Sequence, residues 1–292
     1  MKKIILTIAL SLVTFASVSA KGNDSTKVYL PQKGDFAIGV NLNPILNYVG
    51  NIFNGTTNNK LENFGGEPSF NGIDDYQKGI TPDISFMGKY MITNTFGLRA
   101  NIGFMVENKQ TNVYVQDDKA VALNPFDESK LIDSKNYTRS GMSMMFGTEF
   151  RKGSKRVQGV FGAGILFGWV TDKLTYDYAN KMTEVNQTPT TGLSTYNNNY
   201  RTLAEKNANS CFIGATGSAG VEWFVAPKVA LGAEVNLNLY YIAGGQQYKE
   251  TEGYNQSTQK VETRCDLVSP GNNTFRFGTE SLGGSVYMSF YF

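Results

Sequence analysis

The C-terminal stretch decides the fold; it reads Leu282-Gly283-Gly284-Ser285-Val286-Tyr287-Met288-Ser289-Phe290-Tyr291-Phe292. Successive side chains of a strand point to opposite faces, so the even-numbered residues form one apolar or small face and the odd-numbered residues a more polar one. An exposed terminal strand of this kind invites pairing with another chain, whereas a closed barrel uses its last strand to pair with its first. The stretch therefore predicts an all-β protein whose last strand, pairing with residues 35–43, closes a barrel.

The composition agrees with a β-rich protein that is poor in charge. Of the 292 residues, 18% are charged and 13% are aromatic, and 31 are glycine. Soluble domains have roughly 25% charged residues, and aromatic residues with glycine suit strands better than helices. Lys and Arg number 27 against 25 Asp and Glu, and removing two lysines with a leader brings the balance to zero. This balance gives no reason to expect nucleic acid as a partner.

The first residues have the pattern of a targeting segment. Two lysines precede an apolar core and small residues, which predicts a signal peptide over residues 1–20. We expect residues 21–33 to be a disordered periplasmic lead and residues 34–292 to form the barrel. No later run approaches the ~20 apolar residues that a membrane helix needs. A mature chain that spans a membrane must then do so as a β-barrel.

Alternation of apolar and polar residues recurs along the chain and predicts eight strands. Short turns separate three pairs of strands, whereas four connections of about 30 to 40 residues separate the others, as in barrels with short periplasmic turns and four long extracellular loops. Extra hairpins within the long connections would raise the strand count to ten. The eight strands are expected at 35–43, 83–90, 96–106, 142–150, 157–169, 211–223, 229–241 and 275–292.

Two of the long connections have patterns of their own. Apolar residues between 45 and 53 recur at helical spacing, which predicts a short helix on the barrel rim; a helix in the membrane interface or in the mouth is the alternative. In the next connection, Val113–Gln116 and Ala120–Leu123 flank Asp117-Asp118. This pattern predicts strands that extend beyond the membrane.

The two strand faces differ in charge. The outward parity is apolar and free of charge through the strand middles, where a charge facing lipid would cost ~2 to 4 kcal/mol. The inward parity is polar, which is the inverse of a soluble barrel. Because an eight-stranded barrel is only wide enough for its side chains to fill, we expect the inward charges to form an ion-pair network in the lumen. These residues are Lys89, Arg99, Glu149, Glu222 and Glu234.

A gated polar path through the lumen is the alternative to a packed network. Gly162, Gly164 and Gly168 share the inward face of one strand. They would leave space for such a path, although glycine at these positions would equally accommodate bulky neighbours. The sequence leaves both interpretations open.

The sequence argues against the common catalytic and metal sites. The chain has no histidine, so a Ser/His/Asp arrangement lacks its base, and histidine- or cysteine-rich metal sites are absent. The glycines form no phosphate-binding loop. Two acidic pairs, Asp74-Asp75 and Asp117-Asp118, lack the spacing of a recognised calcium loop. We therefore expect a protein that is not an enzyme and has no cofactor and no metal.

The two cysteines, Cys211 and Cys265, fall on the same side of the membrane in this topology. Cys211 begins the sixth strand at its outer end, and Cys265 lies in the last long connection. In an exported protein two such cysteines can form one disulfide that anchors the loop. A bridge and two free thiols are both open.

The mature chain resembles the eight-stranded OmpA/OmpX-type outer-membrane barrels in strand count and loop asymmetry. The alternating end with Met288, Phe290 and Phe292 resembles the assembly signal of such proteins. The segment Leu30–Gly39, followed by the apolar residues 45–53, looks like that of a group of outer-membrane β-barrel proteins of Bacteroidota.

The resemblance implies location and partners as well as fold. It places the protein in the outer membrane of a Gram-negative bacterium, in contact with outer-membrane lipid and the barrel assembly machinery. We expect a non-enzymatic structural or surface-interaction protein whose long loops contact a surface protein or a glycan. A narrow channel for ions or small solutes is the alternative, because the fold does not assign a function.

Overall fold

The computed structural model describes residues 28–43, 85–207 and 209–292. Several predictions fall outside these ranges: the signal peptide over 1–20, the first part of the lead, the short helix over 45–53 and the acidic pair Asp74-Asp75. Among the described residues, no helix has the length and apolar character needed to cross a bilayer.

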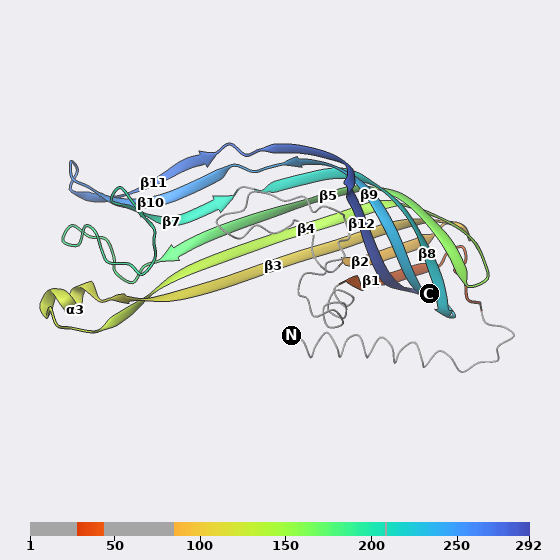
Figure 1. The fold of residues 1–292 in the computed structure, drawn as a ribbon, viewed down its shortest axis with the longest axis horizontal. Coiled ribbons are helices and arrows are strands. Elements are labelled where there is room, and N and C mark those ends of the chain that lie inside the picture. Colours follow the sequence, from red (N-terminus) through yellow and green to blue (C-terminus); the bar gives the residue numbers. More distant parts are fainter. Residues whose placement is uncertain (1–27, 44–84, 208) are drawn as a thin grey trace.

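Eight strands form a closed antiparallel ring, which confirms the predicted fold (Figure 1). Each strand pairs with its neighbours in the ring; β8 pairs with β5, and β12 pairs with β1, so neither of these ring contacts leaves an open edge. The members are β1 (Phe36–Asn41), β2 (Ser85–Met91), β3 (Phe96–Gln116), β4 (Lys130–Ser154), β5 (Val157–Asp177), β8 (Ser210–Ala226), β9 (Val229–Ala243) and β12 (Asn273–Tyr291).

The C-terminal strand closes the ring as its alternation predicts. Ala37 of β1 lies opposite Tyr291, and Asn41 lies opposite Tyr287. Ser285, Tyr287 and Ser289 are buried in the lumen. In the earlier part of β12, by contrast, the odd-numbered side chains point outward. Phe277 of β12 pairs with Leu239 of β9, whereas Leu282 pairs with Leu237, so β12 uses more residues than β9 over this stretch. Three extra residues of β12 bulge out between these pairs, and an odd number of extra residues exchanges the two faces of a strand.

Beyond the ring, the sheet continues on one side of the barrel as a long extension (Figure 1). The outer parts of β3, β4 and β5 run on, and β7 adds to β5, β10 to β7 and β11 to β10. We call this part the distal sheet. The hairpins of the distal sheet lie in connections that were predicted to be loops. They do not enter the ring, so the ring has eight strands. The added strands are β6 (Tyr196–Asn197), β7 (Tyr200–Asn207), β10 (Gln247–Asn255) and β11 (Lys260–Ser269).

The connection between β3 and β4 contains a short helix, α3 (Asp118–Leu123). Val113–Gln116 belongs to β3 as predicted, but the prediction of a second strand over Ala120–Leu123 is wrong. The carboxylate of Asp117 accepts hydrogen bonds from the backbone N–H groups of Lys119 and Ala120. This N-cap satisfies two of the donors that a helix start leaves free, and so favours a helical turn after the strand.

Short turns connect the strands at the other end of the barrel, and the lead packs there. Tyr29 and Leu30 pack against a buried apolar cluster formed by Ala37, Met91, Phe224, Ala230 and Tyr291. The backbone carbonyl of Tyr29 accepts a hydrogen bond from Lys228 N–H, and the ring of Tyr29 lies 3.8 Å from the guanidinium of Arg156. The described part of the lead is therefore ordered, contrary to the prediction, because its apolar side chains complete this cluster.

Candidate functional site

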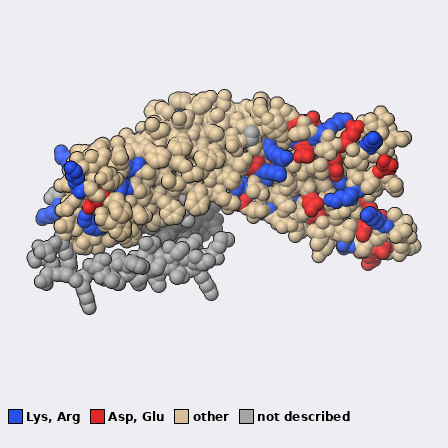
Figure 2. All heavy atoms as spheres, turned by 180° about the vertical axis from the view of Figure 1, so that it is seen from behind, with Lys and Arg blue, Asp and Glu red and all other residues tan. Residues whose placement is uncertain are grey.

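An apolar belt surrounds the barrel. Its side chains alternate with buried ones along each ring strand and are largely exposed. Figure 2 shows a wall of uncharged side chains on the visible face, with Lys, Arg, Asp and Glu at one end of the barrel and spread over the distal sheet. Lipid is the medium that such a wall requires. Belt residues with at least half of their surface exposed include Phe36, Ile38, Phe86, Phe104, Phe146, Phe161, Ile165, Ile213, Trp223 and Val235.

The lumen contains an ionic layer of two cations and two carboxylates. Lys89 Nζ lies 2.6 Å from Glu149 Oε2 and 2.5 Å from Glu222 Oε1. Arg151 Nη2 lies 2.7 Å from Glu149 Oε1 and 2.6 Å from Glu222 Oε2. Tyr287 OH donates a 2.9 Å hydrogen bond to Glu222 Oε1. Each buried charge is therefore compensated by two opposite charges, which buried ions need in order to offset their desolvation.

A second ion pair lies next to this layer. Arg99 Nη1 and Nη2 each lie 2.5 Å from one carboxylate oxygen of Glu234, and Ser285 Oγ donates to the same carboxylate at 2.9 Å. Asn101 and Asn236 line the adjoining cavity, whose volume is about 30 Å³. That volume holds little more than a water molecule. This cavity therefore has room for hydration of the ion pair.

Apolar clusters lie on both sides of the charged layers. Toward the distal sheet, Leu166, Val170, Phe212, Tyr240 and Ile242 pack with Met145. At the turn end, the cluster that contains Phe224 and Tyr291 packs under the ionic layer. The charged layers thus lie between two clusters of buried apolar side chains.

The glycines of β5 lie close to atoms of the neighbouring strands. A Cβ atom on Gly164 would lie 3.0 Å from Met145 Sδ, and one on Gly168 would lie 2.5 Å from the Phe212 ring. One on Gly162 would lie 2.6 Å from Ser218 Oγ. The space left by these glycines is thus filled by neighbouring side chains and backbone.

Arg151 is the lumen residue that the sequence reasoning missed. It falls in the run Arg151–Arg156, which reads as a basic turn, but β4 continues to Ser154 and its guanidinium is buried. It also contacts Tyr291 OH. The alternation of side chains along the strand does indicate that Arg151 points inward, because it shares a face with Glu149, two residues earlier.

The distal sheet holds a long segment, residues 178–195, against its surface. The side chain of Asp133 is fully buried. Its Oδ1 accepts from Ala179 N–H at 2.9 Å, and its Oδ2 accepts from Gly192 N–H at 3.0 Å and from Thr191 Oγ1 at 2.5 Å. One carboxylate of β4 thus fixes both ends of this segment.

Arg201 of β7 holds the start of the same segment. Its Nε donates to Glu252 Oε1 at 2.6 Å, its Nη1 donates to the carbonyl of Asn180 at 2.9 Å, and its guanidinium lies 4.1 Å from the Tyr178 ring centroid. Tyr178 OH donates to the carbonyl of Thr202 at 2.5 Å. Burial raises the pKa of Tyr178 to about 12. The distal segment is thus held by buried polar contacts in a defined shape.

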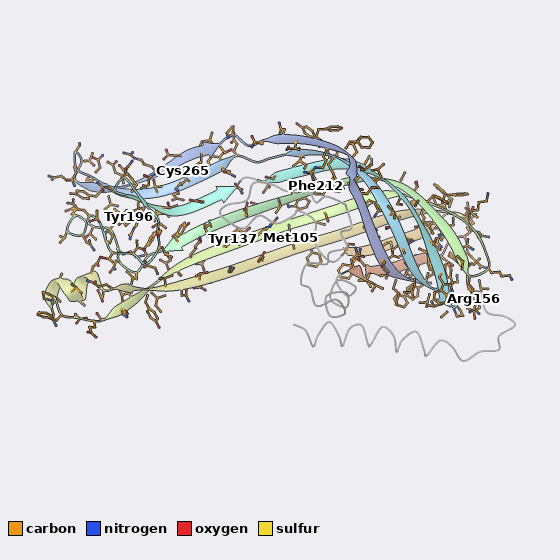
Figure 3. The ribbon with its side chains drawn as sticks, in the orientation of Figure 1. Met105, Tyr137, Arg156, Tyr196, Phe212 and Cys265 are labelled. Atoms are coloured by element: carbon orange, nitrogen blue, oxygen red, sulfur yellow. The ribbon has the colours of Figure 1, made fainter. Side chains whose placement is uncertain are left out.

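The far end of the distal sheet exposes apolar side chains. Leu123, the last residue of α3, and Phe126 are 90% and 91% exposed, and Val185 is 98% exposed. The loop that contains Val185 lies beside α3, because Asp118 accepts hydrogen bonds from Asn186 Nδ2 and Thr190 N–H. Figure 3 shows Tyr196 and Cys265 in the distal sheet, away from Arg156 at the turn end of the barrel.

No protein-family model matches the chain, and no curated protein matches it in sequence. Among solved structures, the chain is similar to the outer membrane protein OprG from Pseudomonas aeruginosa, with 10% identity, a TM-score of 0.35 and coverage of 91% of this chain and 99% of that one. It is also similar to a major outer membrane protein from Thermus thermophilus, with 11% identity, a TM-score of 0.37 and coverage of 89% and 99%.

The belt itself carries the assignment. The chain is an integral outer-membrane β-barrel protein. A closed ring of eight antiparallel strands with an apolar outer wall and a charged lumen is the architecture of bacterial outer-membrane barrels, in agreement with the predicted location in a Gram-negative bacterium. The finer resemblance to OmpA/OmpX-type barrels and to Bacteroidota proteins stays a prediction.

Both cysteines are free thiols and exposed in the structure. Cys211 lies at the start of β8, opposite Ala243, whereas Cys265 lies on β11, opposite Glu250 in the distal sheet. The disulfide considered from the sequence is not formed, because the last connection folds into a hairpin that carries Cys265 away from the ring. Among the described residues, no cluster of His, Cys, Asp or Glu is suited to hold a metal ion.

The residues of the expected assembly signal lie at the seam between the last and first strands. Met288 and Phe290 lie opposite Val40 and Ile38 of β1. The Phe292 ring stacks on Phe36 with centroids 5.1 Å apart, and its N–H donates to the carbonyl of Phe36 at 2.8 Å. The chain end is thus held by the strand that closes the ring.

Proposed function

We propose that this chain is a non-enzymatic outer-membrane protein whose barrel anchors the distal sheet at the cell surface, where the sheet contacts a surface protein or a glycan. The single observation behind the proposal is the contrast between the two halves. The lumen is filled by apolar clusters around paired charges, whereas the distal sheet has a defined shape and exposes apolar and polar side chains at its end.

The direction of insertion follows from how such barrels assemble. The C-terminus lies at the turn end of the barrel (Figure 1), and barrels of this class have short turns on the periplasmic side. The seam residues Met288, Phe290 and Phe292 are then available to the barrel assembly machinery from the periplasm. This orientation places the distal sheet outside the cell.

Protease treatment of intact cells tests the orientation. Trypsin should cleave β11 after Arg264, whose side chain is exposed in the distal sheet. It should leave Lys152 and Lys155 at the turn end uncut until the outer membrane is permeabilised. Cleavage at the turn end of intact cells would reverse the orientation and contradict the proposal.

Planar-bilayer recording tests the closed lumen against a narrow channel. The purified protein should show no steady conductance steps, because each ion would have to cross two apolar clusters. As a positive control, the double variant Phe212→Ala with Phe224→Ala removes one large side chain from each cluster and should produce flickering openings. Steady openings of the unaltered protein that vary with salt concentration would establish the channel instead.

A further inference from the structure

The strand β11 is an open edge of the distal sheet. It pairs with β10 on one side, and among the described residues no strand pairs with its other side. Ten residues without proline or glycine form this edge, most of them exposed. An open edge presents unpaired N–H and C=O groups to any extended strand that reaches it.

The charges on β11 alternate in sign along one face. Lys260, Glu262, Arg264 and Asp266 share the even parity and read plus, minus, plus, minus. Edge strands often carry charges that repel a second strand. When charges alternate in sign, two copies of the same strand repel each other in some registers and attract each other in others.

We propose that the partner of the distal sheet is a second copy of this chain, with the two β11 strands antiparallel and Thr263 opposite Thr263. In this register Lys260 lies opposite Asp266 and Glu262 lies opposite Arg264, and the twofold symmetry repeats both pairs. All four charges of each strand are then matched. Opposite charges and paired threonines are favourable cross-strand contacts in antiparallel sheets.

Neighbouring registers are disfavoured by the same charges. Centring the pair on Arg264 puts Glu262 opposite Asp266, and centring it on Glu262 puts Lys260 opposite Arg264. Like charges directly opposite each other destabilise a sheet. The charge order of β11 therefore selects one register for self-pairing.

The symmetry of this pair determines where the two barrels lie. The twofold axis of an antiparallel strand pair is perpendicular to the sheet, and the wall of a barrel runs along the barrel axis. A half-turn about this twofold axis therefore points the second copy's barrel axis in the opposite direction. As a result, the two barrels lie at opposite ends of the joined sheet. Copies in one membrane cannot pair in this way. Copies in two facing outer membranes can, and many weak contacts between the same two surfaces act together.

This inference rests on the proposed function, since it requires the distal sheet to be exposed outside the cell. The self-pairing itself requires neither a membrane nor a closed lumen. Purified protein in mild detergent therefore tests the pairing even if the bilayer recordings were to show a channel.

Disulfide trapping tests the register. In a Cys211→Ser background, Val261→Cys places a thiol opposite Cys265 of the other copy, and mild oxidation should give a covalent dimer on a non-reducing gel. The matched control Leu267→Cys places its thiol opposite Cys265 only if the pair is centred on Asp266, and should stay monomeric. A dimer from Leu267→Cys, or through Cys265 alone, overturns the register. Monomers with every variant overturn the pairing.

Charge exchange tests the ion pairs. Proteoliposomes that carry the protein with its distal sheet outward should cluster, as measured by light scattering. Arg264→Glu places like charges opposite each other at two sites and should weaken clustering by about tenfold. Adding Glu262→Arg restores opposite charges and should restore clustering, although it does not restore the contact of Arg264 with Tyr200, 4.5 Å to the ring centroid. Clustering that Arg264→Glu leaves unchanged, or that the exchange does not restore, overturns the proposal.

Discussion

Arg99 of β3 and Glu234 of β9 face each other across the lumen and form a bidentate ion pair, with both N–O distances at 2.5 Å. Both side chains are buried. The first prediction concerns Arg99→Ala, which leaves Glu234 as an unpaired buried charge and should lower the free energy of unfolding by about 3 to 5 kcal/mol. Urea unfolding of the protein in detergent or lipid measures the change.

A surface pair provides the matched control for this prediction. Lys206 Nζ lies 3.3 Å from Glu250 Oε2 in the distal sheet, with both side chains partly exposed. Lys206→Ala should change the stability by at most about 1 kcal/mol, because exposed pairs contribute little. Equal losses from the two variants would mean that the lumen pair is hydrated like a surface pair.

The second prediction concerns a glycine that a tyrosine covers. A Cβ atom on Gly232 would lie 2.2 Å from Cζ of Tyr287, whose hydroxyl is held by Glu222. Gly232→Ala should therefore destabilise the barrel by about 1 to 3 kcal/mol through overpacking. Gly217→Ala is the control, since a Cβ atom there has no neighbour within 4 Å. A heat-dependent shift on a gel compares the two, and equal behaviour would contradict the packing of Tyr287.

The third prediction concerns the segment that Asp133 holds. Asp133→Ala leaves the N–H groups of Ala179 and Gly192 without their acceptor, so hydrogen exchange should accelerate over residues 178–195 while the ring strands keep their protection. Asp127→Ala is the control, because that carboxylate accepts from the nearby Ser129 N–H within its own turn. Acceleration that spread to the ring would show that barrel and distal sheet unfold together.

The fourth prediction concerns alkaline pH. Burial raises the pKa of Tyr178 from 10.0 to about 12. Because the folded-state pKa is the higher one, the stabilisation is fully present below pH 10 and is lost as the pH rises from 10 to 12. Ultraviolet titration should therefore show one fewer phenol titrating near pH 12 in Tyr178→Phe than in the unaltered protein. A component that persisted unchanged would assign the late titration to another tyrosine.

The fifth prediction concerns the chain end. Deleting Phe292 removes its stacking on Phe36 and one hydrogen bond at the seam. We expect slower insertion by the barrel assembly machinery and only a small change in the stability of protein already folded. Phe292→Tyr keeps the ring and should insert normally. Insertion of the deletion variant at the normal rate would show that the machinery does not read this residue.

Local alternation was sufficient to predict the ring. The residues from Leu282 to Phe292 and the seven earlier strands show a period of two, because each ring strand has one face toward lipid and one toward the lumen. Inward charges such as Arg99 and Glu234 follow from the same parity. A period of two can be recognised in each strand without knowing which strands are its neighbours. For this reason the ring strands and their two faces can be predicted from the sequence alone.

The distal sheet could not be predicted in this way. Outside the membrane, strand residues such as Asn108, Gln110 and Thr111 are exposed to water on both faces, so no contrast between faces marks them. Whether these segments form strands depends on how β7 pairs with β5 and how β10 pairs with β7. The helix α3 was mistaken for a strand because a six-residue helix is too short to show its own period.

Eight alternating strands that close a barrel with an apolar outside and a charged inside follow from the sequence alone, because each strand shows this alternation separately. The packing of the strands around the ring set which charges meet. It brought Arg151 beside Lys89 between Glu149 and Glu222, and it kept the two cysteines apart. Among the residues that the structure describes, it also left β11 with a strand partner on one side only. These outcomes depend on how strands that are distant in the chain are staggered relative to one another. The sequence of a single strand does not show this stagger.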